Sequence, residues 1–182
     1  MLTNKPNEIL TRSKSWIANF VIHHELCPFA HVSYRANSIN YLISEHSDIR
    51  LLLEDFYTMC QELSSHSNIS NSFLIIPLAA DFDDILTLKQ VADDFLEASE
   101  LQEDFQTVAF HPLFVFEGEQ LDAPGNFVNR SPYPMLHILR VQEVSDALGS
   151  IDDPDSIAVI NKTKLEKLGF DYLSTSLQKL MD

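Results

Sequence analysis

Two histidines, His111 and His137, occupy residues 109–140, the stretch of this chain that is least like an ordinary scaffold. An imidazole titrates near neutral pH, so it suits general acid–base catalysis or metal ligation. Each histidine falls in or at the end of an apolar, strand-like run. If the two strands pair, both imidazoles could face one cleft. The alternative is that each is a core histidine whose ring bonds to the backbone.

The same stretch carries two isolated cations, Arg130 and Arg140, with no other Lys or Arg between Lys89 and Lys162. A planar guanidinium can hold a carboxylate or a phosphate through two parallel hydrogen bonds. The pair could therefore form an anion clamp. The other interpretation is that each arginine makes a structural ion pair with one of the many nearby carboxylates, for example Asp122.

Polar and stiff residues surround Arg130, which makes it the better of the two arginine candidates. Asn129 and Ser131 flank it, and Tyr133 follows with a proline on either side. Prolines restrict the backbone to extended conformations, so they would pre-organise Arg130 and Tyr133 for a ligand. They could equally shape a tight corner, and Asn129 could hydrogen-bond its own loop.

A thiol, Cys27, follows the first predicted helix in the segment HHELCPFAH. A nucleophilic thiol needs a depressed pKa, and the negative end of a helix dipole works against this. Unless a histidine lies beside it, Cys27 is a buried packing residue. A metal or haem site would combine Cys27 with His111 and His137, although the chain has no dense metal motif such as CxxC or HExxH.

Charge and motif content exclude several classes of protein. The net charge is −15, from 27 acidic and 12 basic residues, so we expect neither nucleic acid nor an anionic membrane as a partner. A small anion could still bind where arginines are focused locally. P-loop, dinucleotide-binding and GxSxG signatures are missing. No apolar run is long enough to span a bilayer, and no signal peptide is evident, so we expect a cytoplasmic location.

The spacing of apolar residues predicts the elements that would position these groups. Helices are expected over residues 6–26, 48–63, 81–96, 143–149, 157–168 and 171–181. Strands are expected over 38–45, 72–77, 105–116 with an interruption or end at Pro112, and 135–140. This order indicates an α/β or α+β sandwich, in which helices cover a roughly four-stranded sheet. Residues 1–182 would form a single domain, with 117–134 as a long, functional-looking loop.

The chain resembles an uncharacterised bacterial family, domain of unknown function fourteen-fifteen, in four elements: LCPFA (26–30), FDDILTL (82–88), AFHPLFVF (109–116) and NRSPYPMLHILR (129–140). The resemblance covers nearly the whole chain. It implies a shared architecture and site position, but no reaction. Two positions depart from the family pattern: Ile76-Pro77 replaces a histidine-proline, and Val141 replaces an acidic residue.

Three hypotheses for function follow. The first is an enzyme acting on a small anionic metabolite, in which Arg130, alone or with Arg140, binds the anion. His111 or His137 would transfer protons, with Tyr133 as a hydrogen-bonding or stacking partner. The second is a metal- or haem-binding protein that uses Cys27 and the two histidines. The third is a non-catalytic interaction protein with the loop as its epitope. The residues assign no cofactor and no oligomeric state.

Overall fold

A mixed four-stranded sheet lies at the centre of the computed structural model, which describes residues 5–79, 81–149, 153–154 and 156–181. The strand order is β1-β2-β4-β3, with β1 parallel to β2 and with β4 antiparallel to both of its neighbours. The strands are β1 (Ile39–Ile43), β2 (Asn71–Ile75), β3 (Phe105–Phe110) and β4 (Met135–Arg140). Strands β3 and β4, which lie at the two ends of the 109–140 stretch, therefore do pair.

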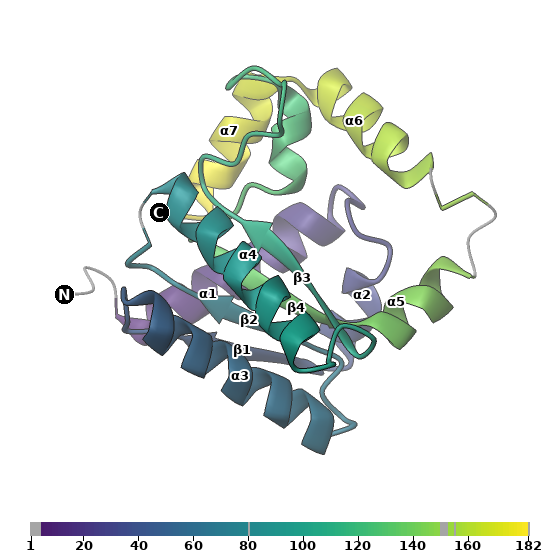
Figure 1. Ribbon diagram of the computed structural model, residues 1–182. Helices are drawn as coiled ribbons and strands as arrows, with labels where there is room; N and C mark the ends of the chain where they lie inside the picture. The colour runs from purple at the N-terminus through teal and green to yellow at the C-terminus, as the bar shows by residue number, and fades with distance from the viewer. Residues whose placement is uncertain (1–4, 80, 150–152, 155, 182) are drawn as a thin grey trace.

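Helices cover both faces of this sheet (Figure 1). This confirms the predicted sandwich, and of the two predicted classes, α/β and α+β, the structure is α+β. The α-helices are α1 (Pro6–Trp16), α2 (Ala30–Arg35), α3 (Ile49–Ser65), α4 (Phe82–Ala98), α5 (Val141–Leu148), α6 (Ser156–Leu168) and α7 (Phe170–Lys179). A π-helix, η1 (Ile17–Ile22), continues α1, and a 3₁₀-helix, η2 (Pro124–Val128), lies in the long loop. None of the described helices has the length and apolar content needed to cross a bilayer.

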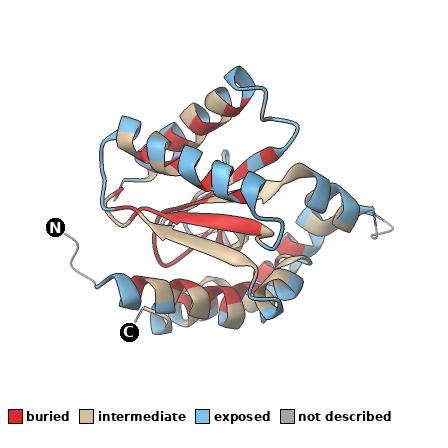
Figure 2. Cartoon of the chain, turned by 90° about the horizontal axis from the view of Figure 1, so that it is seen from below, coloured by how far each residue is buried: buried red, intermediate tan, exposed pale blue. Residues whose placement is uncertain are grey.

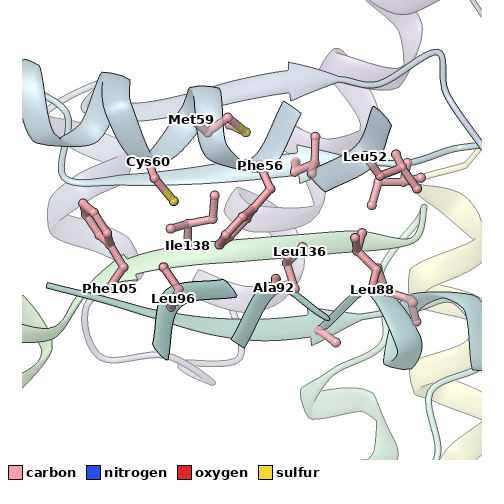
Figure 3. Close-up of a cluster of buried hydrophobic side chains, with 14 of the residues drawn as sticks. Leu52, Phe56, Met59, Cys60, Leu88, Ala92, Leu96, Phe105, Leu136 and Ile138 are labelled. Atoms are coloured by element: carbon pink, nitrogen blue, oxygen red, sulfur yellow. The ribbon is translucent and has the colours of Figure 1, made fainter. Parts of the chain in front are cut away.

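Helices α3 and α4 pack on one face of the sheet (Figure 3). Asp48 begins α3 by accepting hydrogen bonds from the backbone N–H groups of Arg50 and Leu51, as a good N-cap does. Apolar residues three or four positions apart then face the sheet from both helices and meet Leu136 and Ile138 of β4. Side chains alternate along a strand, so the residues between and beside these two point to the opposite face.

Helices α1, η1, α6 and α7 supply the second apolar cluster, against the other face. Trp16, at the end of α1, is buried and donates its indole N–H to Arg130 O at 3.1 Å. Figure 2 shows buried residues on the sheet-facing sides of the helices and exposed residues on their outer sides. Strand β2 is buried at every position, as expected for an inner strand with both faces covered.

The end of the first helix differs from its predicted position, and one short helix was not predicted. The first helix was expected to run to residue 26, but it changes to a π-helix at Ile17 and ends at Ile22, because Glu25 has a left-handed φ of 51°. The third strand, expected over 105–116 with an interruption or end at Pro112, ends at Phe110, two residues before that proline. Helix α2 was missed because its six residues include none that is buried, so its sequence lacks an apolar stripe.

Candidate functional site

A cavity of about 270 Å³ lies between the sheet and the segment that runs from α1 through η1 to α2. Its wall is mainly apolar and aromatic, with Trp16, Phe29, Phe73 and Phe110 among the lining residues. No Asp, Glu, Lys or Arg of the described residues lines it. A concave, mostly apolar space with a few polar groups is typical of a small-molecule site.

His137 is a polar group of this cavity, and the alternation along β4 directs it there. Its ring stacks on Phe73 with centroids 3.9 Å apart and planes 7° apart. Its Nε2 lies 2.9 Å from Asn71 Oδ1. Because an amide oxygen only accepts hydrogen bonds, Nε2 carries the ring proton and Nδ1 keeps its lone pair. The Asn71 amide is held in this orientation because its Nδ2 donates to Ser70 Oγ at 3.0 Å.

Burial lowers the pKa of His137 to about 3. The cause is desolvation, since an imidazolium in this apolar wall would lose its hydration without gaining a carboxylate partner. The imidazole is therefore neutral at physiological pH. It offers a ligand a hydrogen-bond acceptor and not a positive charge.

Cys27 and Asn129 line the same cavity. Burial raises the pKa of the Cys27 thiol, and hydrogen bonds from the backbone N–H groups of Phe29 and Ala30 lower it by a smaller amount. The thiol is thus protonated at neutral pH. Asn129 donates from Nδ2 to Ala109 O at 3.0 Å, and its own carbonyl accepts from His111 N at 3.1 Å. Asn129 therefore also holds the end of β3 against the long loop.

His111 lies on the opposite face of the sheet from His137. It is 2% exposed, its ring centroid is 5.5 Å from that of Phe82 in α4, and its Nδ1 accepts from Leu113 N at 3.1 Å. Val108 is the residue that pairs with His137, so the positions of β3 on His137's face are even-numbered. The expectation that both imidazoles face one cleft is wrong because of this register.

The combination of Cys27, His111 and His137 as metal ligands does not form, because the sheet separates His111 from the other two. Across the part of the chain that the structure describes, no group of three or more His, Cys, Asp or Glu side chains is arranged to hold a metal ion.

Arg130 holds the long loop together. Its Nε donates to Phe114 O at 3.2 Å and its Nη2 to Leu121 O at 2.6 Å. The guanidinium lies over the ring of Phe127, 4.6 Å from its centroid, and burial lowers the pKa of Arg130. The expected alternatives were an anion clamp and an ion pair with a carboxylate such as Asp122. The guanidinium instead contacts backbone carbonyls and aromatic rings.

Arg140 fastens a different part of the fold. Its guanidinium donates to the carbonyl oxygens of Leu63, His66 and Ile69, at the end of α3 and in the turn that leads to β2. This satisfies carbonyls that a helix end leaves without partners. Its Nε also lies 3.4 Å from the carboxylate of Glu143. The two arginines contact separate segments and do not converge on a shared anion site.

Ser131 and Tyr133 form the corner between the loop and β4. Ser131 Oγ donates to Tyr133 O at 2.6 Å, and Arg12 Nη1 lies 3.4 Å from the Tyr133 hydroxyl. Both residues are buried. Of the two roles left open by the sequence, their contacts fit the tight corner.

The cavity thus brings together three of the residues that the sequence singled out: Cys27, Asn129 and His137. Asn71 and Phe73, which orient the imidazole, were not among the candidates. The sequence carried only a weak signal for these two residues. Asn71 and Phe73 alternate along β2, so they share one face of the sheet, but only the pairing register places them beside His137.

Fold and cavity together define an α+β protein with a cavity of small-molecule size, whose described lining residues include no Asp, Glu, Lys or Arg. Residues 8–175 match the family described as protein of unknown function, DUF1415, and the chain belongs to this family. No curated protein and no solved structure shows a significant match.

Proposed function

We propose that the protein binds a compact, uncharged and largely planar molecule in the cavity beside His137. The observation that carries this proposal is that the aromatic wall of the cavity has no charged side chain among the residues that the structure describes. The cavity's titratable side chains, His137 and Cys27, are both held neutral by burial. A charged ligand would lose its hydration there without gaining a counter-charge.

The size of the cavity supports a ligand with one or two rings. An apolar cavity of about 150 Å³ holds benzene, and this one measures about 270 Å³. Trp16 stands nearly perpendicular to Phe73 and Phe110, with ring centroids 6.2 and 5.3 Å away. Such edge-to-face arrangements favour an aromatic guest, whose edges and faces can continue the same packing.

The π-helix η1 is a second argument for a binding site. Ile17 and Val21, both in η1, line the cavity. A π-turn loosens the regular i→i−4 hydrogen bonding, and such turns are frequent at functional sites. Here the wider π-turn lies at the part of the helix that forms one wall of the cavity.

Binding is better supported than proton transfer. A histidine with a pKa of about 3 accepts hydrogen bonds well but is a weak base at neutral pH. The anionic substrate of the first sequence hypothesis also loses support, because Arg130 and Arg140 already donate to backbone carbonyls. A polar group on the ligand would instead donate to the imidazole Nδ1.

Trp16 provides the test, because it is the only tryptophan in the chain and lines the cavity. Toluene and benzyl alcohol are added while Trp16 fluorescence is recorded. We expect a saturable change with a dissociation constant of roughly millimolar, since a ligand of this size gains only a few kcal/mol.

A cavity-filling variant makes the test specific. Val108→Phe places a larger side chain in the cavity from β3 and should abolish the saturable change. Val91→Phe is the control, because Val91 is similarly half-buried but lies on α4 outside the cavity. Equal binding by wild type and Val108→Phe, or a fluorescence change that never saturates, would overturn the proposal.

A further inference from the structure

A groove of about 480 Å³ between α2 and α5 adjoins the cavity. Five residues line both spaces: Phe29, Ser33, Asn71, Leu139 and Val144. The groove therefore lies directly outside the cavity, separated from it only by side chains that the two spaces share. Its position makes it the natural route for a ligand and a second compartment for part of one.

The walls of this groove are the least firmly packed part of the site. Helices α2 and α5 lie side by side at one end of the molecule (Figure 1), and neither has a buried residue. Elements with few buried contacts open at low cost in free energy. A ligand that passes between these helices would displace half-buried residues such as Ala30 and Tyr34 at the edge of the second apolar cluster, but no buried residue of α2 or α5.

The groove differs from the cavity in carrying charge. Arg140, Glu143 and Asp146 line it, and the Arg140 guanidinium faces Glu143 at 3.4 Å. Asp146 has the amide of Gln142 as a partner, at 2.7 Å. The positive charge of Arg140 is therefore balanced by the negative charge of Glu143. The carboxylate of Asp146 is hydrogen-bonded to a neutral amide, so its negative charge is not balanced within the groove. A group placed here meets a net negative charge.

We infer that the ligand spans both spaces, with a planar apolar body in the cavity and a short chain that ends in a cationic amine in the groove. This inference rests on the proposed function, because it needs the cavity to be occupied. The apolar body matches the uncharged wall around His137. The amine matches the groove, where it can replace lost hydration by hydrogen bonds to the Asp146 carboxylate and to nearby polar groups.

Three probes that differ only at the chain end test the inference: phenylbutylamine, phenylbutanol and phenylbutyrate, each titrated against Trp16 fluorescence. We expect the amine to bind most tightly and the carboxylate least tightly, with steps of roughly fivefold, the size of one screened charge contact. Toluene is the reference compound, because it has the planar apolar body without the chain. If toluene binds but the amine binds no more tightly than the alcohol, the inference fails and the proposed function stands. If toluene does not bind, the proposed function fails.

A matched pair of variants separates a contact in the groove from the attraction of an acidic protein for any cation. Asp146→Asn should reduce the advantage of the amine over the alcohol to about twofold or less. Asp94→Asn is the control: Asp94 accepts from Gln90 Nε2 at 2.8 Å on α4, as Asp146 does from Gln142 on α5. Both variants change the net charge equally. If the two reduce the amine's advantage to the same extent, the amine is not held in the groove.

Discussion

The neutral state of His137 gives a direct prediction for stability as a function of pH. The pKa of His137 is lowered to about 3 in the folded protein, whereas an unfolded histidine has a pKa of about 6.5. Between these values the unfolded chain binds the proton and the folded chain does not. The free energy of unfolding therefore falls as the pH drops below about 6.5, and it keeps falling until the folded protein also protonates.

The size of the effect follows from the same two pKa values. Each pH unit in this window costs about 1.4 kcal/mol, so His137 should cost about 2 kcal/mol between pH of about 7.5 and about 5. The assay is urea unfolding at both pH values for wild type and for His137→Phe, which keeps a planar ring beside Phe73. Taking the difference between the two proteins removes the contribution of the carboxylates and of the other histidines.

Wild type should lose about 2 kcal/mol more than His137→Phe over this range. The variant will be less stable at the higher pH, because Asn71 loses its imidazole partner, but its stability should depend less on pH. Parallel losses in the two proteins would show that His137 is readily protonated in the folded state. The account of an uncharged cavity would then be refuted.

Three further predictions follow from the contacts. Arg130→Gln should lower the free energy of unfolding by about 2–4 kcal/mol, since the buried carbonyl of Phe114 and the part-buried carbonyl of Leu121 lose a charged donor; an unchanged urea midpoint would contradict the structural role. In a Cys60→Ala background, Cys27 should react with a thiol reagent much more slowly in the folded protein than in urea, because its pKa is raised; equal rates would contradict this. Asp48→Ala should cost about 1 kcal/mol in urea unfolding through loss of the α3 cap, and a change below a few tenths would refute it.

Much of the fold could be predicted because local patterns encode it. Strand β4 was expected at residues 135–140 and occupies them, and the apolar spacing also located α3, α4, α6 and α7 to within a few residues. Short elements without an apolar stripe gave no such signal, as α2 shows. The π-turn after Trp16 was also invisible, because its residues fit an ordinary helical face equally well.

The candidate site was predicted in part. Residue types alone drew attention to Cys27, Asn129 and His137, and the structure places all three around one cavity. The same reasoning selected Arg130, whose hydrogen bonds to Phe114 O and Leu121 O hold the loop in place. A residue type indicates which interactions a side chain can make, but the fold determines which partner it contacts.

By itself, the sequence determined the family, a sheet covered by helices of the α/β or α+β class, and the concentration of unusual residues in 109–140. The tertiary structure decided which of those residues share a site. Pairing of Val108 with His137 sends His111 to the other face of the sheet, since side chains alternate along a strand. That register depends on partners far apart in the chain, so no local pattern could fix it. The same packing buries the imidazole against Phe73 and, among the described residues, lines the cavity with uncharged side chains.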